Sequence, residues 1–226
     1  MKWYLVGSAL YCCSINFKQM ALYYSLPFFF YLSGKYMERA NRMKSVLSGL
    51  IMFMCIGLTV IGSFAIIWLP FLTSSEQVNQ VLYRIFPVHR GLFEDKVANV
   101  WCSLSLVYKI HLKFELSTVI RLSALLTLLT SLPSCFHVAL KPTVRNFVFC
   151  LVNVSCAFFL WSFHVHEKTI LFVTVPASVL QLLLRADALK QEKYFSSTDE
   201  TADREERAKQ LDVEYSMIHH WFTMIA

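Results

Sequence analysis

Residues 45–72 read SVLSGLIMFMCIGLTVIGSFAIIWLPFL, an apolar run without a charged side chain. A helix that crosses the hydrocarbon core of a bilayer needs about 20 mostly apolar residues. The run is long enough, and Trp68 stands near its end, where aromatic rings commonly lie at the membrane interface. The stretch therefore predicts a membrane-spanning helix.

The composition of the whole chain agrees with a membrane protein. Of the 226 residues, 56% are hydrophobic and only 16% are charged, and the mean hydropathy is +0.50. A soluble domain carries about a quarter charged residues. The formal net charge of +6 is modest, and basic cytosolic loops explain it without a nucleic-acid partner.

Further apolar segments flank this span. Residues 3–32 form one broken helix or two short helices around a polar elbow, which comprises residues 16–19. The other candidate spans are residues 119–140, 146–163 and 169–184, and 215–226 as the start of one more. Because a backbone in lipid must satisfy its own hydrogen bonds, each span should be helical. We expect an all-α integral membrane protein with about six transmembrane helices.

The chain divides by composition into three parts. Residues 1–184 form the membrane domain, residues 185–214 form a strongly charged loop or insertion, and residues 215–226 begin a further helix. Residues 34–44 contain four basic side chains against Glu38 alone, which places them in the cytosol by the positive-inside rule. The loop 73–96 should then face the lumenal side, and the loop 185–214 the cytosol.

The short apolar segment 97–108 leaves the topology open. If it crosses the membrane, the charged loop around Phe86 and the segment that follows His164 lie on opposite faces. If it is a half-span that turns back, both lie on the same face. Its length permits the half-span, whereas Lys109, Lys113 and Arg121 favour a crossing because they suit the cytosol better.

Three polar clusters interrupt the apolar background. The first is the elbow, where Lys18 at membrane depth either extends to an interface or has a functional role. The second lies in residues 83–96, where a turn between Pro87 and Gly91 can gather basic side chains against phosphate oxygens. These are Arg84, His89, Arg90 and Lys96, with Glu94 and Asp95 able to orient them or to polarise a substrate hydroxyl. An ordinary salt-bridged loop remains the alternative.

The third cluster is the segment FHVHEK at residues 163–168. His164 and His166 could chelate a metal, but a third ligand at suitable spacing is missing, so we expect no metal. One histidine can instead contact a phosphate or transfer a proton, with Glu167 and Lys168 beside it. The alternative is a cluster that simply marks a helix end.

Four motifs give these clusters a family resemblance. They are NFKQMALYY at residues 16–24, RIFPVHRGLFEDKVANVWC at 84–102, LTSLPSC at 129–135 and HVHEKTIL at 164–171. In this order they resemble the glucosyltransferases of the endoplasmic reticulum that use dolichyl-phosphate glucose. The resemblance is strongest to the branch that adds the first glucose, in α-1,3 linkage, to the oligosaccharide on dolichyl pyrophosphate.

The resemblance implies part of a GT-C fold in the membrane of the endoplasmic reticulum, with a lumenal active site. It implies dolichyl-phosphate glucose as donor, the lipid-linked oligosaccharide as acceptor, and no cofactor. It assigns His166, His164, Arg84, Arg90 and Lys18 to the donor phosphate, with His166 favoured over His164, and it favours the half-span for residues 97–108.

The resemblance also implies a missing part. The family carries its catalytic aspartate in an early lumenal loop, and Glu94 and Asp95 do not match it by position. We therefore expect an incomplete chain that is inactive alone, with its catalytic base unknown. The alternatives are a transporter, which the lack of a visible inverted repeat disfavours, and a protein that binds lipid phosphate without catalysis.

Overall fold

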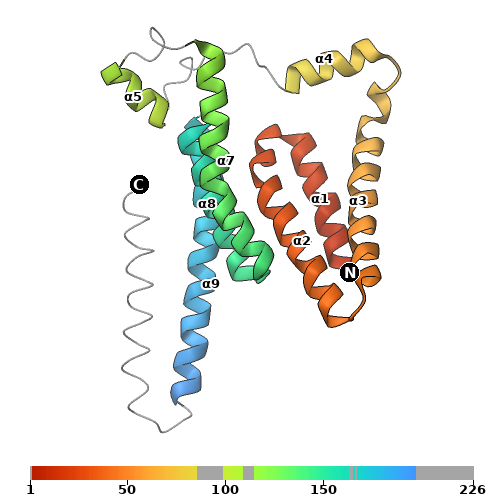
Figure 1. The fold of residues 1–226 in the computed structure, drawn as a ribbon, viewed down its shortest axis with the longest axis vertical. Helices are drawn as coiled ribbons and strands as arrows, with labels where there is room; N and C mark the ends of the chain where they lie inside the picture. The colour runs from red at the N-terminus through yellow and green to blue at the C-terminus, as the bar shows by residue number, and fades with distance from the viewer. Residues whose placement is uncertain (1, 86–98, 109–114, 163–164, 166, 197–226) are drawn as a thin grey trace. The chain divides into compact units, whose positions relative to one another are not determined.

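The computed structural model describes residues 2–85, 99–108, 115–162, 165 and 167–196. Within these ranges every regular element is a helix, which confirms the all-α prediction (Figure 1). The α-helices are α1 (Lys2–Phe17), α2 (Ser25–Arg42), α3 (Val46–Trp68), α4 (Ser75–Ile85), α5 (Val100–Tyr108), α7 (Leu116–Leu140), α8 (Val144–Trp161) and α9 (Leu171–Ser196). The 3-10 helices are η1 (Gln19–Tyr24), η2 (Leu69–Phe71) and η3 (Glu167–Ile170).

Four described helical segments are long and apolar enough to cross a membrane: residues 46–71, 117–140, 144–161 and 168–191. They match four of the predicted spans. The predicted span at residues 3–32 is two helices, α1 and α2, separated by η1. Residues 215–226 lie outside the described part.

The chain divides into two compact units, residues 1–177 and 178–226. The described part of the second unit is the remainder of α9. This helix continues beyond residue 184, where the sequence predicted a charged loop, and is described as far as Ser196. The rest of that loop, from residue 197, lies outside the described residues.

In the first unit, α2 packs against both α3 and α7, and α7 packs against α8. The approach of α2 to α7 is very close at Gly34, where a Cβ atom would overlap the carbonyl oxygen of Ala139. Small residues commonly permit such approaches between membrane helices. Phe30 and Phe136 extend the contact along the two helices, with an edge-to-face geometry and 5.3 Å between ring centroids.

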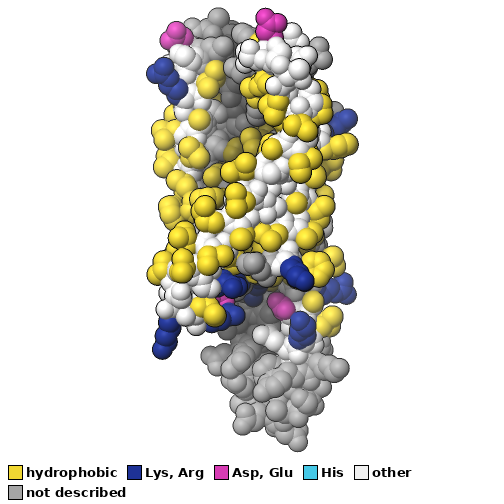
Figure 2. Space-filling model, turned by 90° about the vertical axis from the view of Figure 1, so that its right-hand side faces the viewer, with side chains coloured by type: hydrophobic (Ala, Val, Ile, Leu, Met, Phe, Trp, Pro, Cys, Tyr) yellow, Lys and Arg dark blue, Asp and Glu magenta, His cyan; other side chains and the backbone are white. Residues whose placement is uncertain are grey.

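The helix α3 exposes most of its apolar surface. Its buried residues are Gly49, Met52 and Ile56, whereas Leu58, Ile61 and Ile66 are exposed. Figure 2 shows hydrophobic side chains over the face of the molecule on which α3 lies. Such a surface suits contact with lipid. Soluble proteins usually expose scattered apolar residues and rarely a large contiguous apolar surface.

Hydroxyl groups inside the apolar helices donate hydrogen bonds to backbone carbonyl oxygens four residues earlier in the same helix. The hydroxyl of Thr59 donates to the carbonyl oxygen of Cys55 at 2.8 Å, and that of Ser63 donates to Thr59 at 2.7 Å. The buried Ser131 donates in the same way to Thr127 at 2.7 Å. These bonds satisfy polar groups where a membrane supplies no water.

Candidate functional site

The elbow is a break in the helical backbone at Lys18. This residue has extended backbone angles, φ −148° and ψ 116°, between the end of α1 and the start of η1. Its N–H still donates to the carbonyl oxygen of Ser14 at 2.9 Å, and its own carbonyl oxygen accepts from the N–H of Ala21 at 3.0 Å. The Lys18 side chain is exposed. The break therefore presents an ammonium group while the N–H and the carbonyl group of Lys18 itself stay hydrogen-bonded.

Side chains of α1 and α3 hold the elbow in place. The amide of Asn16 donates to the carbonyl oxygen of Cys12 at 2.8 Å and accepts from the indole N–H of Trp68 at 2.6 Å. The hydroxyl of Tyr11 donates to the carbonyl oxygen of Ala21 at 2.9 Å. The end of α3, where Trp68 lies, is thus fixed beside the elbow, and Asn16 is bound on both sides of its amide.

Two tyrosines of η1 connect the elbow to the region around η3. The hydroxyl of Tyr24 donates to the carbonyl oxygen of Phe172 at 2.6 Å, near the start of α9. The ring of Tyr23 stacks on that of Phe158, near the end of α8, with 4.6 Å between centroids. The elbow therefore lies at the same end of the first unit as the end of α8 and the start of α9.

A tryptophan pair places α5 at this end as well. The indole N–H of Trp101 donates to the carbonyl oxygen of Trp161 at 2.8 Å, and the hydroxyl of Ser123, in the first half of α7, donates to the same oxygen. Trp101 is almost fully buried and packs on Val119. Because α5 has nine residues and rises about 1.5 Å per residue, it covers only half a membrane. Its contacts agree with the half-span alternative.

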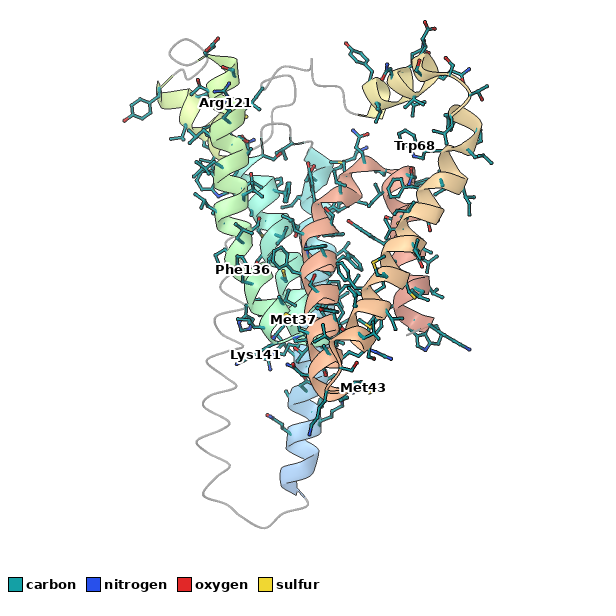
Figure 3. All side chains as sticks on the ribbon, turned by 45° about the vertical axis from the view of Figure 1, so that its right-hand side comes forward. Met37, Met43, Trp68, Arg121, Phe136 and Lys141 are labelled. Carbon is teal, nitrogen blue, oxygen red and sulfur yellow. The ribbon has the colours of Figure 1, made fainter. Side chains whose placement is uncertain are left out.

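We call this end of the helices the elbow end; Trp68 and Arg121 lie at it in Figure 3. Of the predicted site residues, it holds two with described side chains, Lys18 and Lys168, and both are exposed. Arg84 belongs to α4 and Glu167 to η3. The others lie outside the described residues: His89, Arg90, Glu94, Asp95, Lys96, His164 and His166.

The elbow end also contains a buried polar atom beside Lys168. Thr169 is fully buried, and its hydroxyl has no hydrogen-bond partner within the described part of the chain. In the same part, no three His, Cys, Asp or Glu side chains gather in a way that could hold a metal ion. What the described residues offer at this end is therefore exposed ammonium groups, together with amide, indole and hydroxyl groups that fix the backbone between them.

Sequence reasoning missed Trp101, Trp161 and Ser123 as parts of this end. Trp101 stands near the start of the apolar segment 97–108 and Trp161 near the end of the segment 146–163, and such aromatic residues mark membrane interfaces. That signal could have placed each of them at an interface. It could not have paired them, because 60 residues separate the donor from the acceptor.

Comparisons with known proteins place these features in a family. The profile of the ALG6, ALG8 glycosyltransferase family matches residues 1–197. The dolichyl pyrophosphate Man9GlcNAc2 alpha-1,3-glucosyltransferase of Gallus gallus is 48% identical over 178 residues, which are 79% of this chain and 34% of that protein. The probable enzyme of the same name from Dictyostelium discoideum is 44% identical over 179 residues, again 79% of this chain and 34% of the relative. The Schizosaccharomyces pombe protein, also named as probable, is 38% identical over 179 residues. The chain thus spans about a third of the length of the curated relatives it matches.

Proposed function

Because this chain belongs to the ALG6, ALG8 glycosyltransferase family, we propose that it serves in the transfer of glucose to the oligosaccharide on dolichyl pyrophosphate, in α-1,3 linkage. The donor is dolichyl-phosphate glucose, and the reaction takes place in the membrane of the endoplasmic reticulum. The observation that carries the proposal is the 48% identity over 178 residues to a relative whose name states the α-1,3-glucosyl transfer and its Man9GlcNAc2 acceptor.

The proposed site is the elbow end, and it faces the lumen. The distribution of charge supports this orientation, since the chain at the other end of α2, α3, α7 and α8 carries six basic residues against one acidic residue, Glu38. By the positive-inside rule, this part of the chain lies in the cytosol. The elbow end is then lumenal, where the long polar head of a lipid-linked oligosaccharide can meet the donor.

In the proposed reaction, a hydroxyl oxygen of the acceptor attacks the anomeric carbon of glucose, and the bond from that carbon to the phosphate oxygen breaks. A carboxylate base takes the hydroxyl proton, and dolichyl phosphate leaves as an anion. Positive groups that meet the leaving oxygen lower the barrier by stabilising this developing charge. Among the described residues, Lys18 is the best candidate for this role. It is exposed at a break whose backbone is fixed by Asn16 and Tyr11.

The remaining phosphate-side candidates are proposed from the sequence. They are His166, His164, Arg84 and Arg90, supported by His89, Glu94, Asp95, Lys96, Glu167 and Lys168. Two contacts support a common location. Trp101, which follows residues 84–96, donates to Trp161, and Tyr24 donates to Phe172, so the chain before and after residues 164–168 lies at the elbow end. The base is not assigned to a residue.

A segment exchange tests the proposed function. The matching segment of the Gallus gallus relative is replaced by that of this chain, and the hybrid is expressed in cells that lack the endogenous enzyme. We expect microsomes with the hybrid to transfer glucose from dolichyl-phosphate glucose to the Man9GlcNAc2 lipid, as the unaltered relative does. A hybrid that accumulates normally but forms no glucosylated lipid would contradict the proposal and favour a lipid-phosphate binder without catalysis.

A further inference from the structure

The indole N–H of Trp68 has its partner within the chain. Trp68 stands near the end of an apolar span, where an interfacial tryptophan commonly turns its N–H towards water or lipid headgroups. In the structure this N–H donates instead to the side-chain oxygen of Asn16 at 2.6 Å. Both residues are partly buried. The polar atom of this tryptophan therefore serves a contact between two helices and not only an anchor at the membrane surface.

Asn16 connects Trp68 to the end of α1. Its amide nitrogen donates to the carbonyl oxygen of Cys12 at 2.8 Å, one turn earlier in the same helix, while its amide oxygen accepts from Trp68. Since α1 ends at Phe17 and α3 ends at Trp68, one amide group joins the ends of the two helices. The two partners are 52 positions apart in the chain, so the local sequence around Asn16 cannot replace this bond.

Lys18 lies directly after this joint between α1 and α3. The α-helical backbone ends at Phe17, and the exposed side chain of Lys18 leaves the chain from an extended residue. On the other side of the break, the hydroxyl of Tyr11 holds the carbonyl oxygen of Ala21 at 2.9 Å, and the ring of Tyr11 stacks on Phe28 with 4.3 Å between centroids. The break is thus held before and after Lys18, and the place of the ammonium group depends on both contacts.

We propose that Trp68 is a positioning residue for glucosyl transfer, which fixes the end of α1 through Asn16 and thereby the place of the Lys18 ammonium. This inference rests on the proposed function, in which Lys18 meets the phosphate of the donor. Trp68 acts on Lys18 and not on a substrate. A group that stabilises a leaving oxygen must lie at hydrogen-bond distance from it, and a misplacement of about 1 Å can cost on the order of 100-fold in rate. Because Tyr11 still holds Ala21 when Trp68 is changed, the loss should be smaller than that.

Trp68→Phe in the hybrid enzyme of the segment exchange tests the positioning role. Phenylalanine keeps an aromatic ring at the end of α3 but lacks the N–H. We expect kcat/KM for dolichyl-phosphate glucose to fall about tenfold, because the ammonium is no longer held in place. The KM for the acceptor lipid should stay the same. Trp3→Phe is the matched control, since it makes the same exchange at a tryptophan that is 86% exposed, and it should transfer glucose at the rate of the unaltered hybrid.

Combined variants show whether Trp68 acts through Asn16 and Lys18. Asn16→Ala removes the acceptor and should lower kcat/KM at least as much as Trp68→Phe, and the double variant should lower it no further than Asn16→Ala alone. In the Lys18→Met hybrid, Trp68→Phe should cost less than about twofold, because the charge that it positions is already gone. A tryptophan with a purely structural role would instead reduce transfer by the same factor with and without Lys18.

Hydrogen exchange in the purified, detergent-solubilised chain gives a readout that does not depend on glucosyl transfer. The backbone N–H of Lys18 donates to the carbonyl oxygen of Ser14, and that of Ala21 donates to the carbonyl oxygen of Lys18. Both bonds cross the break, so they open more often when the end of α1 is released. We expect these two amides to exchange about tenfold faster in Trp68→Phe, and at the unaltered rate in Trp3→Phe.

Three results would overturn the proposal. The first is equal transfer by Trp68→Phe and the unaltered hybrid, and the second is an equal factor of loss with and without Lys18. The third is unchanged exchange of the two amides in Trp68→Phe. An unaltered hybrid that transfers no glucose is a different result, because it contradicts the proposed function. Faster exchange in Trp68→Phe would then still show that this tryptophan holds the elbow.

Discussion

Replacing Gly34 by alanine is expected to destabilise the packing of α2 against α7. The added Cβ atom would overlap the carbonyl oxygen of Ala139, which is backbone and cannot turn away as a side chain can. Overpacking of a close contact costs about 1–3 kcal/mol, and occasionally more. Alanine favours a helix over glycine by about 0.5–1 kcal/mol, so the overlap should win. We expect a lower thermal unfolding midpoint of the purified protein in detergent.

Gly62→Ala in α3 is the matched control. It makes the same chemical change in a helix, but no atom lies within 4 Å of the added Cβ. Only the gain in helix propensity remains, so the unfolding midpoint should stay the same or rise slightly. A midpoint for Gly34→Ala at or above that of Gly62→Ala would show that α2 and α7 do not approach each other as described.

The second large effect is expected at Lys18, measured in the hybrid enzyme of the segment exchange. Lys18→Met keeps most of the side-chain length and removes the charge. A hydrogen bond to a charged group contributes about 1.5–3 kcal/mol, which corresponds to roughly 10- to 150-fold in rate. We expect kcat/KM for dolichyl-phosphate glucose to fall by this factor, and Lys18→Arg to recover part of it because the positive charge is kept.

Lys2→Met is the control for this change, since Lys2 is an exposed lysine at the other end of the same helix. It should leave transfer close to that of the unaltered hybrid. If Lys18→Met transferred glucose within twofold of the unaltered hybrid, the phosphate-side role of Lys18 would be wrong. The family assignment would still stand, because it rests on the match over residues 1–197.

The sequence predicted the long helices well, because a run of about 20 apolar residues has few other folded states in lipid. The span predicted at residues 45–72 is α3 with η2, and the one predicted at 146–163 is α8. The elbow was also recognisable, since Asn16, Lys18 and Gln19 interrupt an apolar run. Whether the chain broke there was left open, and the structure shows two helices separated by η1.

The place of α5 could not be predicted from its residues. Its apolar composition suits both a crossing and a half-span, and the nearby basic residues favoured the crossing. Its place depends on the hydrogen bond from Trp101 to Trp161, which joins residues far apart in the chain. The assignments of His166, Arg90 and the residues near them stay predictions, because these residues lie outside the described ranges.

The central claim is that Glu76, before the charged loop, and Lys168, after α8, lie on one side of the membrane, and that Lys44 lies on the other. A cysteine introduced at one of these three exposed positions at a time can show on which side of the membrane that position lies. The more exposed native cysteines, Cys13, Cys55, Cys102 and Cys156, are replaced by alanine. Cys12, Cys135 and Cys150 are kept, because at most 1% of each is exposed.

The most direct measurement is labelling of these single cysteines in sealed microsomes with a maleimide that cannot cross the membrane. Between positions 76 and 168 the half-span leaves two crossings, α7 and α8, whereas a spanning 97–108 segment would make three. We predict that Lys44→Cys is labelled in sealed microsomes, and that Glu76→Cys and Lys168→Cys are labelled only after permeabilisation. Labelling of Glu76→Cys and Lys168→Cys from opposite sides would contradict the claim.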